Sequence, residues 1–412
     1  MRNLLRHIAE IVVLWLFRKR AGQGGLALLV VSGVLAGCSD EQAERVGEYV
    51  TLQAQSVVGG YEEEDETRSF SPTRSDPTSP SWAPGYYLYD DLNGSFEGRK
   101  NLMKKSISAF FTSDGQTPVE GTFFYRSYDS TWQLDNIEVT GGSYFLYGFI
   151  PSEDAESATI APNGSYSDGA VLTINGLNAV TPSDVCVIIG AKDGTDKKTA
   201  LGLQQGHFAT EIKTGESSHN YIFLLFDHLY SALRFSFTVD ANYAQLRTIK
   251  LRKLELIAYS DDHGGGVKAK YNATITLRKN DAGTTPIEGR VAFTPVSTSA
   301  NVAPVPLYEW DGDAAHDLVL STTEPADFMG CFVPGDHVYF KLRSTYDVYD
   351  RQKNLIREHC QAENTIDLRT KFGSFISTTR GHSYSYTIKV QPTYLYVLSE
   401  PDLDNPTVKI ED

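Results

Sequence analysis

Short apolar runs separated by turn residues cover most of this chain, and they constrain its fold more than any other feature. The runs have the length of β-strands, and glycine, asparagine or aspartate residues lie between them. Only residues 241–246 suggest a short helix. Strands at such intervals favour β-sandwiches over helical or α/β folds. The strand-like runs of the first half are 106–112, 121–128, 144–150, 171–174 and 185–189.

A polar stretch near 202–218 divides these runs into two series and marks the predicted domain boundary. We therefore predict an all-β protein with two β-sandwich domains, at 85–215 and 216–412, and a single elongated domain is the alternative. The second series comprises 221–226, 232–239, 248–257, 273–277, 290–293, 332–342 and 383–390.

One predicted strand, at 46–58, stands apart from both series. Its apolar residues alternate along one face, and an acidic run (62–66) and a Pro/Ser/Thr-rich stretch (69–84) separate it from the first domain. A lone strand cannot satisfy its backbone hydrogen bonds, so it must complete a sheet elsewhere. We predict a strand and flexible linker over 38–84, and the face consists of Val50, Leu52, Ala54 and Val58.

Residues 1–37 have the character of a targeting segment. Basic residues at 18–20 precede an apolar run at 26–36 that is too short to span a bilayer. The run ends in Leu35-Ala36-Gly37-Cys38, which resembles the lipobox of bacterial lipoproteins. We expect a lipoprotein signal peptide at 1–37 and a lipid with palmitate chains on Cys38, which would anchor the chain to the outer membrane at the cell surface. An ordinary cysteine in an uncleaved anchor is the alternative.

The charge of the chain argues against a nucleic-acid partner. Its 412 residues include 52 acidic and 37 basic ones, a net charge of −15. Removal of 1–37 takes away five basic residues and one acidic residue, which leaves 32 basic and 51 acidic residues and a net charge of −19. Such a chain repels phosphate backbones.

No residue pattern indicates an enzyme, a cofactor or a metal. GxSxG, HExxH, Walker and GxGxxG motifs are all absent from the sequence. His228 follows Asp227, but with no nucleophile pattern nearby a buried structural histidine is favoured over a catalytic base. The acidic residues at 311, 313 and 317 lack the remaining ligands of a calcium loop, so a plain turn is favoured there.

Three cysteines remain once Cys38 is lipidated, and no CxxC pair or zinc spacing occurs among them. Cys186 lies in an apolar run and is predicted to pack in a core. Cys331 and Cys360 either pair with each other or stay free.

Several aromatic motifs follow the lipobox in order: Trp132 with 144–151, 225–228 with 233–237, 246–256 with Tyr259, and 381–390. Together they resemble the fimbrillins of Bacteroides-type bacteria, which are subunits of lipoprotein-derived pili. The resemblance implies two transthyretin-like, Greek-key β-sandwiches. It also implies that an arginine-specific protease cuts a lipidated precursor. The cut subunit would join other fimbrial subunits by strand exchange, and the resulting fimbria would adhere to a host or bacterial surface ligand.

The linker contains two candidate cleavage sites. Arg68 follows the acidic run and directly precedes Ser69-Phe70, so it is the first choice, and Arg74 is the second. The alternative is that both are plain linker residues. A cut after Arg68 would remove nine acidic and two basic residues of 38–68 and bring the net charge from −19 to −12. The smaller charge would lower repulsion between subunits.

The C-terminal tail is the candidate donor strand for a neighbouring subunit. Aromatic and β-branched residues alternate there, which suits a strand that fills a groove. A tail that pairs within its own domain is the alternative, and it would favour a tip or accessory subunit over a stalk subunit. The candidate residues are Tyr394, Tyr396, Leu398, Val408 and Ile410.

A surface glycan-binding lipoprotein of a nutrient-uptake system is the second reading of this sequence. Such a protein would use the residues after Cys38 as a plain tether, whereas a fimbrial subunit needs the 46–58 strand folded into its body and then removed.

Overall fold

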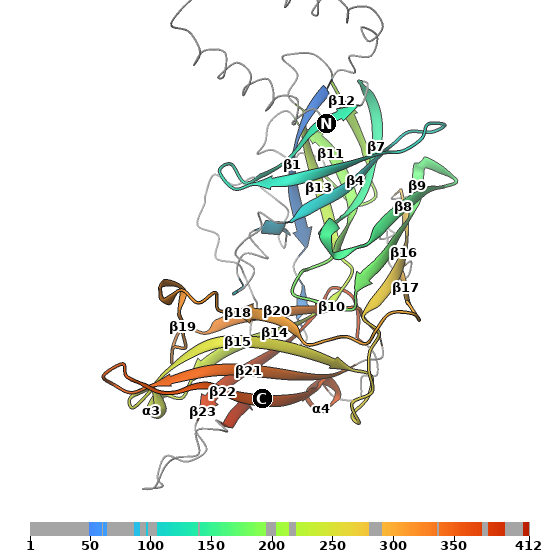
Figure 1. Ribbon diagram of the computed structural model, residues 1–412. Helices are drawn as coiled ribbons and strands as arrows, with labels where there is room; N and C mark the ends of the chain where they lie inside the picture. The colour runs from blue at the N-terminus through green and yellow to red at the C-terminus, as the bar shows by residue number, and fades with distance from the viewer. Residues whose placement is uncertain are drawn as a thin grey trace, which may run out of the picture. The chain divides into compact units, whose positions relative to one another are not determined.

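A computed structural model describes most of the chain after residue 48, and the described part is nearly all β, which confirms the all-β prediction. Within that part, no helix is both long and apolar enough to cross a membrane. The described residues are 49–59, 61–63, 86–90, 96–97, 105–138, 141–194, 203–213, 220–279, 291–335, 338–372, 378–391 and 407–411 (Figure 1).

The largest sheet has nine strands, and seven of them form a closed ring. β7 pairs with β4 on one side and with β11 on the other, so the order β11-β13-β1-β6-β5-β4-β7 returns to its start. β12 also pairs with β7, and β3 with β1. The strands are β1 (Tyr49–Gly59), β3 (Tyr86–Leu88), β4 (Ser106–Thr112), β5 (Val119–Arg126), β6 (Thr131–Glu138), β7 (Gly142–Ile150), β11 (Cys186–Gly194), β12 (Ala209–Ile212) and β13 (Asn220–His228).

A four-stranded sheet joins segments from both predicted domains. Its order is β17-β16-β9-β8, and every pair is antiparallel. The strands are β8 (Ser157–Asn163), β9 (Ser165–Asn178), β16 (Lys270–Arg278) and β17 (Val291–Pro295). The predicted boundary near 215 stays a prediction.

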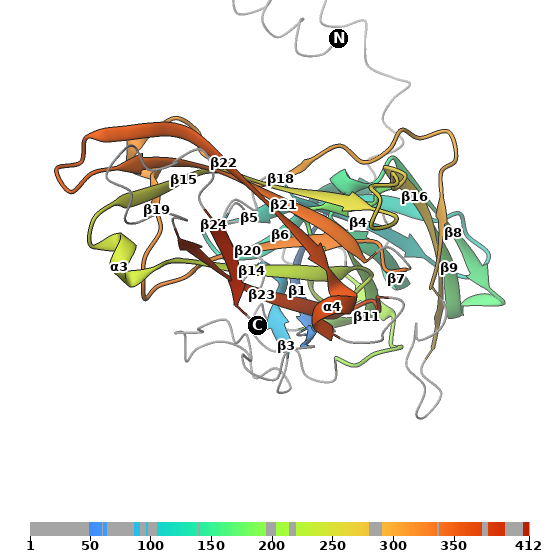
Figure 2. The same cartoon turned by 90° about the horizontal axis from the view of Figure 1, so that it is seen from below.

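A six-stranded sheet contains β24, the last described strand, and β2, the short strand that follows β1. Its order is β10-β20-β14-β23-β2, and β24 also pairs with β23 (Figure 2). Its strands are β2 (Glu62–Glu63), β10 (Val180–Thr181), β14 (Ser231–Val239), β20 (Ala326–Phe332), β23 (His382–Gln391) and β24 (Thr407–Glu411).

A five-stranded sheet contains the longest stretches of the second strand series. Its order is β18-β15-β21-β22, with β19 paired to β15. Its strands are β15 (Thr248–Tyr259), β18 (Val305–Glu309), β19 (Leu318–Val319), β21 (Tyr339–Tyr349) and β22 (Leu355–Asp367).

The described helices are short, because no long stretch of the sequence places apolar residues at the 3.6-residue spacing of a helix. The predicted turn of helix near 241 is α3 (Ala241–Ala244), which Asp240 caps by accepting hydrogen bonds from the backbone nitrogens of Asn242 and Tyr243. The others are the α-helix α4 (Leu368–Phe372) and the 3₁₀ helices η2 (Ser152–Asp154) and η3 (Ala314–His316).

Two hydrophobic clusters fill the described fold. The first gathers side chains of the seven-stranded ring and of the four-stranded sheet, including Trp132, Tyr147 and Ile275. The second lies between the six- and five-stranded sheets and includes Phe235 and Phe340. Apolar residues at every second position of β14 supply this second core, as their period of two predicts, and β15 keeps the same period on each side of a bulge between Leu251 and Lys253.

We expect Gly148→Ala to destabilise the ring. A Cβ at Gly148 would lie 2.1 Å from the backbone oxygen of Ser108 on β4, so the two strands would have to separate. Overpacking of this kind costs about 1–3 kcal/mol in the free energy of unfolding, measurable by urea denaturation. Gly59→Ala is the matched control, because a Cβ there meets nothing within 4 Å, and equal losses in both variants would contradict the expectation.

Candidate functional site

β1 lies between two ring strands that are far from it in the sequence. Residues 52–58 pair in parallel with 220–226 of β13, and the first half of β1 pairs antiparallel with β6 (Figure 1). Its last residues also pair with β3. The isolated strand therefore has partners on both edges, and its removal would leave β13 and β6 with unpaired edges that face each other.

The apolar face of β1 is part of the first core. Leu52, Ala54 and Val58 are completely buried, and Val50 pairs through its backbone with Ile137. The opposite face does not show the exposed positions that a simple alternation of buried and exposed residues would give, because Val57 and Gln55 are buried as well. Both faces of the second half of β1 are thus covered, which a half-exposed edge strand would not show.

Three polar contacts hold β1 in its register. The indole Nε1 of Trp132 donates to the hydroxyl of Ser56 at 2.8 Å, and the side-chain amide of Gln55 donates to the carbonyl of Ser130 at 3.0 Å. At the end of the strand, Nε2 of His228 lies 2.7 Å from the carbonyl oxygen of Gly59. Hydrogen bonds between buried groups are costly to leave unmade, so they favour one position of the strand.

His228 is a buried residue, as its sequence context predicts, but its acidic partner is Asp184 and not the neighbouring Asp227. Its Nδ1 lies 2.9 Å from Oδ2 of Asp184, whereas Asp227 pairs with Arg380. Burial lowers the pKa of His228, but the carboxylate of Asp184 outweighs burial and the net shift is upward. The ring of Tyr61 stacks on the imidazole with 4.0 Å between centroids.

All three cysteines in the described part of the chain are free and buried. The pairing of Cys331 with Cys360 is therefore not formed, and Cys186 packs in the first core, where the sequence predicts it. Burial, followed by the nearby Asp184 carboxylate, holds the pKa of the Cys186 thiol well above its ordinary value.

β2, which follows β1 in the chain, and β24, the last described strand, both pair with one edge of β23. β2 pairs in parallel with the start of β23, at 382–383, and β24 pairs antiparallel with its end, at 387–391. β14 occupies the opposite edge of β23. In the tail, Val408 faces Val390 and Ile410 faces Ile388 in the ladder, so this part of the candidate donor pairs within its own chain.

The other predicted site residues lie outside the described part of the chain. They are Cys38, Arg68, Arg74, Tyr394, Tyr396 and Leu398. Their lipidation, cleavage and donor roles stay predictions.

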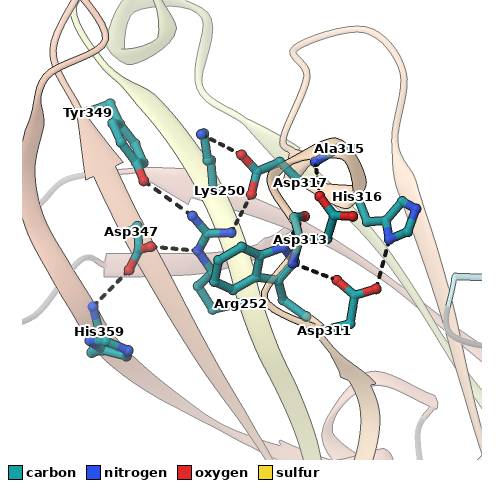
Figure 3. Close-up of polar contacts among 11 residues, drawn as sticks. Lys250, Arg252, Asp311, Asp313, Ala315, His316, Asp317, Asp347, Tyr349 and His359 are labelled. Carbon is teal, nitrogen blue, oxygen red and sulfur yellow. Dashed lines mark hydrogen bonds and ion pairs between the residues drawn. The ribbon is translucent and has the colours of Figure 1, made fainter.

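The acidic residues near 311 form a turn joined to a partly buried ion-pair cluster (Figure 3). Asp311 accepts from the backbone nitrogen of Asp313 and pairs with His316, and Asp313 caps η3. Asp317 pairs with Lys250 and Arg252 of β15. Each of these three carboxylates therefore has a partner within the protein.

Arg252 is the centre of that cluster. Its guanidinium pairs with Asp317 and with Asp347 of β21, and it also lies 3.7 Å from the centre of the Trp310 ring (Figure 3). Burial raises the pKa of Asp317, but the hydrogen bonds from Lys250 and Arg252 outweigh burial and the net shift is downward. The cluster ties β15, β21 and the turn before β19 together.

Known proteins similar to this chain were found among solved structures. No protein-family model matches the sequence, and no curated protein sequence matches it. The chain is similar to a putative cell adhesion protein from Bacteroides fragilis, with 13% identity, a TM-score of 0.37, and coverage of 88% of this chain and 97% of the other. It is similar to a fimbrial protein from Bacteroides vulgatus, with 12% identity, a TM-score of 0.27, and coverage of 76% and 92%.

A third similar structure is the fimbrial anchor protein Mfa2 from Porphyromonas gingivalis. The identity is 9% and the TM-score 0.23, and the match covers 87% of this chain and 95% of the other. The three solved structures come from Bacteroides and Porphyromonas and are named as putative cell-adhesion or fimbrial proteins.

We expect Leu52→Ala to lower the free energy of unfolding by about 2–5 kcal/mol, because it empties a fully buried position in the ring. Phe124→Ala on β5 is the control, since Phe124 is 61% exposed and its loss costs within about 0.5 kcal/mol. Denaturant unfolding measures both. A small effect of Leu52→Ala would mean that β1 is not part of the folded core.

We expect Asp317→Asn to reduce the acid sensitivity of the fold. Because the pKa of Asp317 is lowered in the folded chain, its ion pairs contribute stability above the ordinary aspartate pKa of about 3.9, and this contribution is lost as the pH falls through the lowered value. The variant lacks that contribution at neutral pH and therefore loses less stability between about pH 5 and 2.

Urea midpoints across this pH range measure the difference between Asp317→Asn and the unaltered chain. Glu324→Gln changes an exposed carboxylate to an amide and is the control. A pH profile of Asp317→Asn that is parallel to that of the unaltered chain would contradict the expectation.

Proposed function

We propose that this chain is a structural and adhesive subunit of a surface fimbria, exported as a lipoprotein and joined to other subunits by β-strand exchange. The observation that carries the proposal is the place of β1. It is a central strand of a closed ring, yet a segment with two candidate cleavage residues follows it in the sequence.

Loss of β1 would create a groove of the right kind for a strand from another subunit. The edges of β13 and β6 would lose their hydrogen-bond partners, and apolar side chains of the first core, including Trp132, Ile222 and Leu224, would lose the cover of Leu52 and Ala54. An extended segment with alternating apolar residues restores both the ladder and the burial.

A cut after Arg68 would separate β1 and β2 from the rest of the chain together. β2 pairs only at the start of β23, so its loss would free that edge next to the place where β24 pairs. One cut could therefore open two neighbouring acceptor edges, one in the ring and one on β23.

The C-terminal tail is suited to leave its place more readily than β1. In the described part of the chain, β24 has five residues and pairs with β23 alone, whereas β1 has eleven residues and pairs on both edges. A strand held on one side has fewer hydrogen bonds to lose. The tail is thus the proposed donor, with Val408 and Ile410 as its described residues.

The test is limited digestion of the full chain in mild detergent with an arginine-specific protease, followed by intact mass, gel and size-exclusion measurements. We expect a cut at Arg68 or Arg74, loss of the first strand and growth of oligomer ladders. The double variant Arg68→Lys, Arg74→Lys is the matched control, because it keeps both charges and should stay uncut and monomeric.

Two results would contradict strand exchange. A cut chain that keeps its first strand and remains a monomer would favour an anchor or tip role. A chain that loses 39–68 with no change in stability or assembly would favour the glycan-binding reading, in which this segment is a tether.

A further inference from the structure

Three buried side chains of types that can bind a metal ion lie close together near the C-terminal end of β1. Asp184, Cys186 and His228 place one oxygen, one sulfur and one nitrogen atom within 4.8 Å of one another, and all three residues are buried. Cys186 is the first residue of β11 and His228 the last residue of β13, and the two are partners in the ladder between these strands. Sequence spacing gave no sign of this group, because the cysteine and the histidine are 42 residues apart.

The distances in this group suit tetrahedral zinc. The sulfur of Cys186 lies 3.6 Å from Nδ1 of His228, and Oδ1 of Asp184 lies 3.2 Å from the same nitrogen. Zinc bonds of about 2.3 Å to sulfur and about 2.0–2.1 Å to nitrogen or oxygen, at a tetrahedral angle, separate sulfur from nitrogen by about 3.6 Å and nitrogen from oxygen by about 3.3 Å. Both separations therefore agree with those between ligand atoms around a bound zinc ion.

The second ring nitrogen of His228 has the partner that a zinc-binding histidine needs. Nε2 lies 2.7 Å from the carbonyl oxygen of Gly59, which can only accept, so Nε2 carries a proton. That bond fixes the ring and leaves Nδ1 as the atom for a metal. Tyr61 stacks on the ring and helps to close the group off from solvent.

The charges of the group also balance with zinc. Zinc binds the deprotonated thiol, the carboxylate and the neutral imidazole, and these three ligands with Zn²⁺ sum to zero charge. Mixed sulfur, nitrogen and oxygen ligands suit zinc, whereas calcium and magnesium prefer oxygen alone.

We propose that Asp184, Cys186 and His228 form a structural zinc site that joins the ends of β11 and β13. Structural zinc has four ligand atoms, so the second carboxylate oxygen of Asp184 would complete the set, and the burial of all three side chains keeps substrate away from the site. Asp184 has both carboxylate oxygens near Nδ1, at 2.9 and 3.2 Å, so it can supply one or two ligand atoms. This inference does not depend on the fimbrial proposal.

The test is the metal content of the full chain. The protein is produced with zinc in the medium, purified in detergent without chelator, and measured by native and inductively coupled plasma mass spectrometry. We expect one zinc per chain in the unaltered protein and in Cys360→Ser, which changes a free cysteine of β22. Cys186→Ser should lose the zinc.

A second measurement keeps the proposal testable if Cys186→Ser fails to fold. The unaltered chain is unfolded, refolded with Co²⁺ and examined for the sulfur-to-cobalt charge-transfer band and the intense visible bands of tetrahedral cobalt. Asp184→Asn should weaken cobalt binding by more than about 100-fold, beyond the usual effect of losing an outer partner. Two results would overturn the proposal. One is the absence of both zinc and the cobalt bands in the unaltered chain, and the other is zinc retained by Cys186→Ser. Either result would leave the group as a buried ion pair beside a thiol.

Discussion

The pairing of β1 with β13 and β6 is the interaction on which the rest of the first core depends. Without it, the strand order would run from β13 through β11, β7, β4 and β5 to β6 with two free edges. With it, the sheet closes, and side chains from all seven strands share one interior that contains Trp132 and Tyr147. A strand from the start of the chain therefore completes a core that later residues build.

The closure also explains why the polar contacts of β1 are so specific. Ser56, Gln55 and Gly59 each meet a different partner, on β6, on the turn before it and on β13. A replacement strand would have to satisfy or avoid the same buried partners, since an unpaired buried donor is costly. Those partners give the groove a register as well as an apolar surface.

β2 and β24 are attached to the second core differently from β1 in the ring, because both pair with the edge of a single strand, β23. Its edge accepts β2 in parallel and β24 antiparallel at separate residues, so one strand binds segments from both ends of the chain. Neither segment is enclosed on both sides in the part of the chain that the structure describes. The ring requires β1 for closure, whereas the second core contains side chains of β14 and β20 from this sheet and of β15 from the five-stranded sheet.

The sequence by itself determined the all-β class, the isolated first strand and the inward face of Leu52, Ala54 and Val58, because the two-residue period of a strand is a local property. It also indicated a turn at Asp311 and a structural role for His228. Only the tertiary structure decided that β1 pairs with β13 and β6, that Asp184 is the partner of His228, and that Val408 and Ile410 return to β23. These contacts join residues far apart in the chain, and which strands become neighbours depends on the packing of the whole core, which no local pattern encodes.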